Sequence, residues 1–214
     1  MNKKILLIGG GGHCKSVLDS LLELNEYAEI GIVDKEENIG KSVMGVPVVG
    51  CDDDLPALFR DGYRCAFVTV GSIGNPTLRI KLFKLLSEIG YEIPVIIDNS
   101  AKVSKHAKIE QGVFIGKQST INAGALIQKG AIINSGSIVE HDCQIGAFSH
   151  IAPGAVLGGE VVVGENSHVG LNSTVKQQIH IGSNSIIGMG SVVIRSIDHD
   201  TIAYGNPCME VKKL

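Results

Sequence analysis

The sequence predicts two domains, a small Rossmann-like α/β domain over residues 1–98 and a parallel β-helix of hexapeptide repeats over residues 99–214. The first observation is an aliphatic residue at every sixth position from Val103 to Val193, without insertion or deletion. The second is that apolar runs typical of strands alternate with stretches of helical spacing before residue 98. A length of 214 residues fits one or two domains.

The repeat has a period of six, which fits neither an amphipathic helix nor an alternating strand. The residue four positions after each aliphatic is usually small, as at Ala125, Ser137 and Cys143. Short strands that turn at regular corners, with one aliphatic per side filling the interior, explain both features. Three hexads per turn give a triangular coil, and the repeat is long enough for about five coils. The aliphatic positions are Val103, Ile109, Ile115, Ile121, Ile127, Ile133, Val139, Ile145, Ile151, Leu157, Val163, Val169, Val175, Ile181, Ile187 and Val193.

The first domain begins with a buried-strand pattern that runs into four glycines and then into helical spacing. We expect strands at Lys4–Ile8, 30–33, 66–70 and 93–97. After His13 we expect a helix with Val17, Leu18, Leu21 and Leu22 on one face, and a second helix over about Thr77–Ile89. Strands and helices in this order predict a parallel sheet with helices on its faces. About 95 residues suit roughly half of a dinucleotide-binding fold.

The loop Gly9–Gly12 matches the dinucleotide fingerprint incompletely, because the third glycine position falls on Cys14 or Lys15. Glycines before a helix still bring backbone N–H groups together and favour a phosphate. Asp34, at the end of the second strand, is placed to accept hydrogen bonds from ribose or sugar hydroxyls. A tight turn without a ligand is the alternative. A nicotinamide enzyme fits less well, since the second half of that fold is missing.

Composition narrows the function classes. The net charge of −3 does not indicate binding to nucleic acid. No apolar run is long enough to span a membrane. The five cysteines are an odd number without zinc spacing, so we expect a cytoplasmic protein. Beyond Val193 the repeat stops, and Tyr204–Pro207 with the basic pair Lys212 and Lys213 is expected to cap the last coil.

The cluster Glu140-His141-Asp142, with His150 nine residues after His141, is the candidate for chemistry. An imidazole is a natural general base near neutral pH, and a carboxylate raises its basicity. Neighbours in a strand point to opposite faces, so Asp142 can contact His141 only if the backbone bends between them. Solvated corner residues are the alternative. His150 and His168 lie one predicted coil apart, where they can stack, but no third ligand completes a metal site.

A family resemblance adds to these patterns. The hexapeptide ladder resembles that of the left-handed β-helix acyltransferases. Within them, Gly10-Gly11-Gly12-His13, Val33-Asp34 and the run Glu140-His141-Asp142-Cys143, Ile145-Gly146 and Phe148-Ser149-His150 resemble the bacterial NeuD/PglD-type sugar acetyltransferases. The resemblance covers essentially the whole chain.

The resemblance implies a homotrimer that holds acetyl-CoA in the groove between neighbouring β-helices. His141 matches the family's general base, and Asp142 matches the carboxylate that polarises it, although many members have Glu there. His150 matches a contact to the acetyl group, and Leu171 and Met189 match backbone contacts to the pantetheine arm. The matches to the nucleotide-sugar site are Gly11, Gly12, His13, Asp34 and Gly71; Lys35 departs from members with a second acid at that position.

We therefore expect N-acetylation of a nucleotide-linked amino sugar, a UDP-4-amino-4,6-dideoxy sugar, in bacterial glycan biosynthesis. The acceptor amine would attack the thioester directly, with His141 as base and no metal. O-acetylation of sialic acid or a related sugar is the alternative within this class. A non-catalytic solenoid used for binding or assembly is the alternative from a different class.

Overall fold

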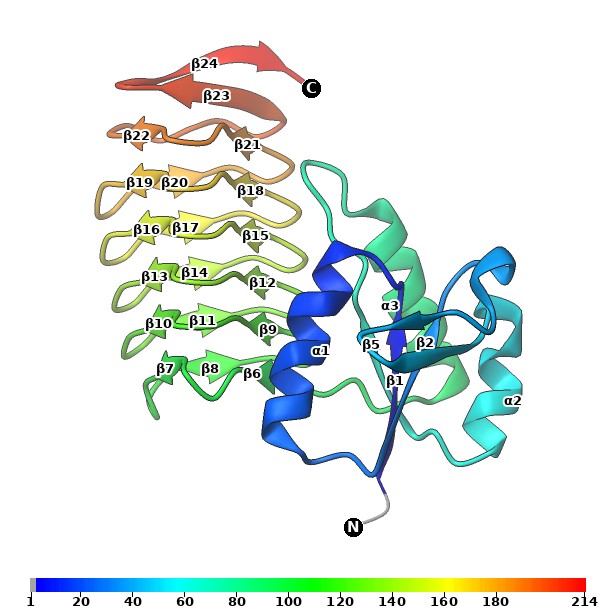
Figure 1. Ribbon diagram of the computed structural model, residues 1–214. Coiled ribbons are helices and arrows are strands. Elements are labelled where there is room, and N and C mark those ends of the chain that lie inside the picture. Colours follow the sequence, from blue (N-terminus) through cyan, green and yellow to red (C-terminus); the bar gives the residue numbers. More distant parts are fainter. Residues whose placement is uncertain (1–2) are drawn as a thin grey trace. The chain divides into compact units, whose positions relative to one another are not determined.

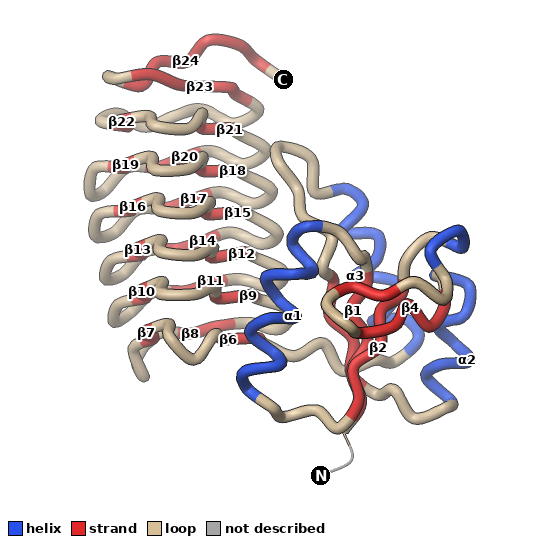
Figure 2. The backbone as a smooth tube through the Cα atoms, viewed as in Figure 1, coloured by secondary structure: helices blue, strands red, loops and turns tan. Residues whose placement is uncertain are grey.

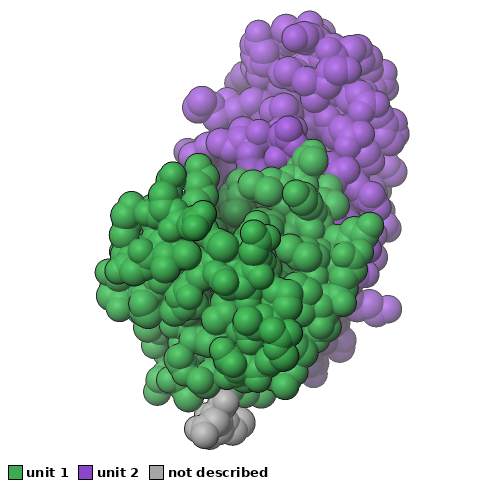
Figure 3. All heavy atoms as spheres, turned by 90° about the vertical axis from the view of Figure 1, so that its right-hand side faces the viewer, with its two compact units in different colours: residues 1–71, 77–96 green, residues 72–76, 97–214 purple. Residues whose placement is uncertain are grey.

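The computed structural model describes residues 3–214, which form two compact units (Figure 3). Among the described residues, unit 1 comprises 3–71 and 77–96, and unit 2 comprises 72–76 and 97–214. The short segment Ser72–Pro76 therefore packs with the repeats, although it lies within the first half of the chain.

Unit 1 is the expected parallel α/β domain (Figure 1). Its elements are β1 (Lys4–Ile8), α1 (Gly12–Leu24), β2 (Glu29–Val33), η1 (Glu36–Asn38), β3 (Ser42–Val43), β4 (Val46–Gly50), η2 (Asp52–Asp54), α2 (Leu55–Arg60), β5 (Cys65–Val68) and α3 (Thr77–Ile89). The sheet has the order β3-β4-β2-β1-β5, in which β1 pairs in parallel with β2 and β5, β2 pairs in parallel with β4, and β3 is antiparallel to β4. The interior strand β1 is buried throughout Ile5–Ile8, as the continuous apolar run predicts.

The prediction that residues 93–97 form the last strand of this sheet is wrong. Only Ile96–Ile97 forms a strand, β6, and it joins a sheet of the β-helix next to β9. Pro94 interrupts the run, because proline has no N–H to donate to a ladder. Residues on its two sides pair differently: Glu92 forms an isolated parallel bridge with Cys65, the first residue of β5, whereas β6 pairs with β9 (Phe114–Ile115).

Unit 2 is a triangular β-helix in which two-residue strands stack coil upon coil (Figures 1 and 2). Within the described residues, β7 to β21 make five complete three-strand coils, as the length of the repeat predicts. One side holds β7 (Lys102–Val103), β10 (Thr120–Ile121), β13 (Ile138–Val139), β16 (Val156–Leu157), β19 (Thr174–Val175) and β22 (Val192–Val193). The second side holds β8 (Lys108–Ile109), β11 (Leu126–Ile127), β14 (Gln144–Ile145), β17 (Val162–Val163) and β20 (His180–Ile181). The third side holds β6, β9 (Phe114–Ile115), β12 (Ile132–Ile133), β15 (His150–Ile151), β18 (His168–Val169), β21 (Ile186–Ile187) and the terminal hairpin.

The interior explains the repeat. Aliphatic side chains such as Ile127 and Val139 are fully buried, as predicted. The small residues are not only space-saving, because the serines also hydrogen-bond between coils. Ser149 Oγ donates to Gly164 O at 2.6 Å and accepts from Ser167 N at 3.1 Å. A larger side chain at these positions would break a buried polar ladder.

The C-terminal cap is a hairpin of β23 (Thr201–Gly205) and β24 (Cys208–Lys213) (Figure 1). β23 continues the third side in parallel with β21, and β24 then pairs with β23 in the antiparallel sense. The turn contains the cis bond Asn206–Pro207. On this side of the last coil, β23 thus pairs with the open strand groups of β21. Nowhere in residues 3–214 is a helix both long enough and apolar enough to cross a membrane.

Candidate functional site

His141 and Asp142 occupy the corner that joins β13 to β14, and their side chains are in contact. His141 Nδ1 lies 2.9 Å from Asp142 Oδ2. Asp142 has a φ of 59°, in the left-handed region, which turns the backbone so that two chain neighbours face each other. Aspartate tolerates this conformation better than most residues. The bend that the His–Asp contact required is therefore present.

The electrostatics of this corner favour a basic imidazole. The hydrogen bond to Asp142 is the largest effect and raises the pKa of His141; desolvation opposes it, and the nearby charges of Asp142, Glu140 and Glu160 raise the pKa further. Since the carboxylate accepts the proton on Nδ1, Nε2 carries a free lone pair when the ring is neutral. The His141 side chain is 56 % exposed, so a substrate can reach that nitrogen.

His150 lies on β15 and points outward, as predicted, but both of its ring nitrogens are engaged. Nδ1 lies 3.0 Å from the carbonyl oxygen of Ser72, which can only accept, so Nδ1 carries the proton. Nε2 lies 3.2 Å from Asn134 Nδ2. The amide is held in this orientation because its Oδ1 accepts from Ser135 N at 2.8 Å. In this arrangement Nδ1 of His150 donates and Nε2 accepts.

His168 stacks on His150 one coil further on, as the spacing predicts. The two rings are T-shaped, with centroids 4.9 Å apart. His168 is buried, and burial lowers its pKa. In the part of the chain that the structure describes, no three histidine, cysteine, aspartate or glutamate side chains are grouped to hold a metal ion.

Leu171 and Met189 lie one coil apart at another corner of the β-helix. Gly190 N donates to Leu171 O at 2.8 Å, which stacks the two turns directly. Both side chains are unusually exposed for apolar residues, 44 % for Leu171 and 78 % for Met189. This corner therefore presents two exposed apolar side chains from successive coils.

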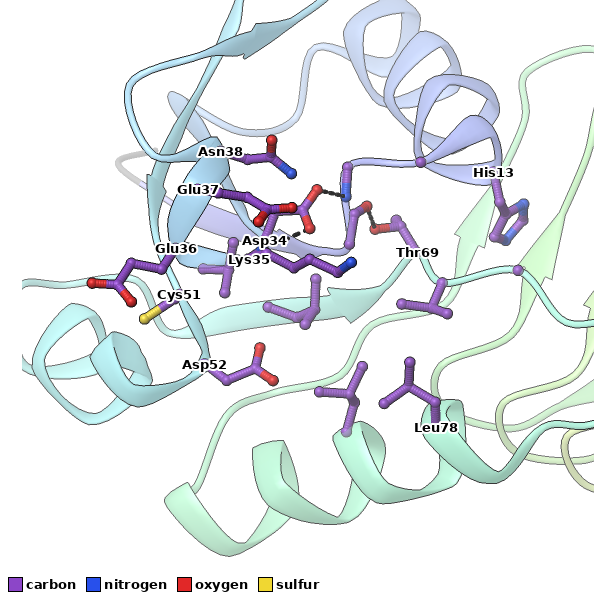
Figure 4. Close-up of a pocket in the computed structure, with 18 of the residues that line it drawn as sticks. His13, Asp34, Lys35, Glu36, Glu37, Asn38, Cys51, Asp52, Thr69 and Leu78 are labelled. Carbon is purple, nitrogen blue, oxygen red and sulfur yellow. Dashed lines mark hydrogen bonds between the residues drawn. The ribbon is translucent and has the colours of Figure 1, made fainter.

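Unit 1 contains a pocket of about 730 Å³ at the carboxyl end of its sheet (Figure 4). All five residues expected to bind a nucleotide sugar line it: Gly11, Gly12, His13, Asp34 and Gly71. They come from the loops after β1, β2 and β5, which end at the same edge because these strands are parallel. An added Cβ on Gly71 would lie 3.4 Å from His13 Cβ, so these two loops meet closely.

Asp34 is tied to the glycine loop itself. Its Oδ2 accepts from Gly10 N at 3.0 Å and its Oδ1 accepts from Lys35 N at 2.7 Å (Figure 4). The remaining lone pairs of both oxygens face a pocket of nucleotide size. The following helix, α1, has Gly11 at its N-cap, and no described side chain caps its first turn. Its first N–H groups are therefore suited to an anion.

Sequence reasoning missed the far wall of this pocket, formed by Cys51, Asp52, Leu78 and Leu82 among others. Asp52 follows β4, another parallel strand of the sheet, and its pKa is raised by desolvation and by Asp53. The signal was present, because residues after a parallel strand gather at the ligand edge. It was missed because Pro47 and the short hairpin made Val46–Gly50 unlike a strand.

Comparisons with known proteins follow this division of the chain. Residues 4–86 match the PglD N-terminal domain family, residues 91–172 the GMPPB C-terminal domain family, and residues 160–195 the hexapeptide repeat of succinyl-transferase. The acetyltransferase domain of PglB from Neisseria gonorrhoeae FA1090, solved with acetyl coenzyme A, is 34 % identical. That match covers 99 % of this chain and 100 % of the solved PglB domain, with a TM-score of 0.92.

The chain belongs to the NeuD/PglD-type family of sugar acetyltransferases. PerB from Caulobacter crescentus, solved with CoA and GDP-perosamine, is 37 % identical over 98 % of this chain and 97 % of its own, with a TM-score of 0.91. Variants of that perosamine N-acetyltransferase with a histidine replaced by asparagine or alanine have also been solved. WeeI from Acinetobacter baumannii AYE, at 22 % identity, shares the fold. Family membership confirms the left-handed β-helix and the acetyltransferase class expected from the sequence.

Proposed function

We propose that this protein transfers the acetyl group of acetyl-CoA to an amino group of a nucleotide-linked sugar. The observation that carries this proposal is the contact between His141 Nδ1 and Asp142 Oδ2 at an exposed corner of the β-helix. It provides an oriented base with a raised pKa. The relatives solved with acetyl-CoA or with CoA and an amino-sugar nucleotide support the same reaction class.

In the proposed mechanism the acceptor nitrogen attacks the thioester carbon while His141 Nε2 takes the proton that the nitrogen loses. Collapse of the tetrahedral intermediate breaks the carbon–sulfur bond. The coenzyme A thiolate leaves and takes the proton from the imidazolium, which restores the neutral base. No acyl-enzyme is needed. Cys143 is fully buried, its pKa is raised to about 11 by burial, and its Sγ donates to Gly158 O, so it is unsuited as a nucleophile.

The acetyl-CoA site of this proposal runs along the outer surface of unit 2. His150 contacts the acetyl group, and the turns of Leu171 and Met189 bind the pantetheine arm. Because His150 Nε2 already accepts from Asn134, we assign the oxyanion to a backbone N–H rather than to this imidazole. A homotrimer, with acetyl-CoA in the groove between neighbouring β-helices, completes the proposal and rests on the family resemblance.

The acceptor site is the pocket of unit 1. The diphosphate lies at the N-terminus of α1 against Gly11, Gly12 and His13, and Asp34 accepts from ribose hydroxyls. Gly71 lies where its missing side chain leaves room beside His13. A UDP-4-amino-4,6-dideoxy sugar is the acceptor that the family resemblance indicates.

A GDP-linked amino sugar is a second candidate, which one observation favours. The pocket wall missed by sequence reasoning carries the Asp52 carboxylate beside the apolar side chains of Leu78 and Leu82. Guanine presents N–H donors next to each other on one edge, which a carboxylate can accept. Uracil presents carbonyl oxygens on both sides of a single N–H, and these would face the carboxylate unfavourably. The relative solved with GDP-perosamine agrees with this candidate.

The test is thiol release from acetyl-CoA by the purified protein with three acceptors in parallel: a UDP-linked 4-amino sugar, a GDP-linked 4-amino sugar and free sialic acid. Release with an amino-sugar nucleotide, reduced about 100-fold or more by His141→Ala, supports the proposal. Thiol release with sialic acid alone would show O-acetylation in place of the proposed N-acetylation. A rate that His141→Ala leaves unchanged would contradict the assignment of the base.

A further inference from the structure

Gly159 lies directly over the His141 ring in the next coil. Glu160 N donates to His141 O at 2.9 Å, and Gln178 N donates to Gly159 O at 2.9 Å. These bonds place residues 18 apart at the same corner of successive coils. The corner position is occupied in turn by Ala123, His141, Gly159 and Gln177.

A side chain at residue 159 would collide with the imidazole. The three heavy atoms nearest to an added Cβ all belong to His141: Nε2 at 2.5 Å, Cε1 at 2.6 Å and Cδ2 at 3.2 Å. Contacts this short do not occur between a real Cβ and a ring, so one of the two would have to move. The ring is 56 % exposed and is the part free to move outward.

The backbone gives no other reason for glycine here. The φ of Gly159 lies outside the left-handed region, so an alanine would not be strained. The corner itself accepts side chains, since Ala123 and Gln177 occupy the same position in neighbouring coils. Gly158 is different, because a Cβ there would meet the backbone nitrogen of Gln177 at 2.7 Å. Gly158 is required by the coil, whereas Gly159 is required only by His141.

We propose that Gly159 is a positioning residue for the general base: its missing side chain leaves the space in which the His141 ring lies while Nδ1 contacts Asp142. The inference rests on the proposed function.

The test is Gly159→Ala, with Gln177→Ala as the matched control from the same corner. Gly159→Ala is expected to lower kcat about 10-fold to 100-fold, because a displacement of the base by about 1 Å has an effect of this size. The KM for acetyl-CoA should stay within about twofold, and Gln177→Ala should leave both constants unchanged. Thermal unfolding of Gly159→Ala should match that of the wild type, since the corner tolerates a side chain.

A double-mutant cycle decides whether the effect passes through His141. Combined with His141→Ala, Gly159→Ala should have no further effect on the rate, because the ring it displaces is absent. An equal loss in both backgrounds would overturn the proposal, as would an unchanged kcat in Gly159→Ala.

A titration of His141 by NMR separates this inference from the proposed function, because it needs no activity. Displacement from Asp142 removes the hydrogen bond that raises the pKa of His141, so Gly159→Ala should lower that pKa. A lowered pKa in a protein that acetylates none of the acceptors would sustain the positioning role and reject the function. An unchanged pKa would reject the positioning role even in an active enzyme.

Discussion

His141 and Asp142 are chain neighbours whose side chains touch, with 2.9 Å between Nδ1 and Oδ2. In an extended strand such neighbours point to opposite faces. Here the left-handed backbone of Asp142, with φ at 59°, turns its carboxylate back onto the imidazole. The contact thus depends on the corner of the β-helix and not only on the two residue types.

Asp142→Asn should change the pH dependence of the rate. His141 must be neutral to accept a proton, so kcat/KM rises with pH through the pKa of His141. Asp142 is the largest cause raising that pKa. Removing its charge should move the acidic limb of the profile to lower pH and lower the plateau about 10-fold to 100-fold, because the base is weaker and less well held.

Glu160→Gln is the matched control for this experiment. Glu160 raises the pKa of His141 through its charge alone and is the smallest of the causes. In Glu160→Gln the acidic limb of the pH profile should therefore move to lower pH by less than in Asp142→Asn, and the plateau of kcat/KM should be retained. A pH profile that is the same in Asp142→Asn and in the wild type would show that Asp142 does not set the basicity of the group that titrates.

The sequence predicted unit 2 well because each hexad obeys one steric rule. An aliphatic such as Val139 fills the interior, and a small residue such as Ser149 leaves room for the next coil, so a single period determines the fold. Unit 1 was predicted less completely. Pro47 made the sequence of β4 unlike that of a strand, and Pro94 divides an apolar run that was predicted to be one strand.

The residues of the candidate site could be chosen from the sequence by type, but their contacts could not. Candidates such as His141 and Asp34 were found, because an exposed histidine beside an acid and an acid after a strand are visible in the chain. The φ of Asp142 and the bond from Gly10 N to Asp34 were not predictable from spacing, since both depend on the local path of the backbone. The role of Gly159 emerges only when coils 18 residues apart are stacked.

His168 should lower the free energy of unfolding in acid. Burial lowers its pKa in the folded protein, so the unfolded chain binds the proton first as the pH falls. Stability should fall from about pH 6.5, the ordinary value, down to the lower folded-state pKa. His168→Ile should weaken this dependence, because Ile186 occupies the next position of the same column.

Urea unfolding midpoints at about pH 7.5 and about pH 5.5 measure this effect, since they bracket the start of the titration. His180→Gln, at an exposed histidine, is the control and should keep the wild-type dependence. If His168→Ile loses as much stability in acid as the wild type, another group carries the acid sensitivity.

The buried serine ladder gives a prediction for stability. Ser167 Oγ donates to Gly182 O at 2.7 Å and accepts from Ser185 N at 3.0 Å. Ser167→Ala leaves both groups without this partner inside the coil and should lower the free energy of unfolding by about 1–3 kcal/mol. Denaturant unfolding measures the change. Ser167→Cys should lower the free energy of unfolding by less than Ser167→Ala does, because Cys143 shows that a thiol can donate to the equivalent carbonyl, Gly158 O. If both variants lose the same free energy, the loss comes from packing and not from the hydrogen bonds.

We expect Gly10→Ala to weaken acceptor binding, because the glycine loop and Asp34 act together there. An added Cβ would lie 2.6 Å from Asp34 Oδ2, the oxygen that accepts from Gly10 N. The carboxylate must then move, which disturbs the pocket wall where we place the ribose. The KM for the nucleotide sugar should rise about 10-fold, with the KM for acetyl-CoA unchanged, because a lost binding contact appears in the KM of the ligand that makes it.

Steady-state kinetics with each substrate varied in turn measure both constants. In an Asp34→Ala background the collision is gone, so adding Gly10→Ala should change the acceptor KM by less than about twofold. If Gly10→Ala raises the acceptor KM equally in both backgrounds, the glycine serves the ligand directly by allowing its phosphates close to the backbone. If it raises the KM for acetyl-CoA instead, the pocket of unit 1 is not the acceptor site.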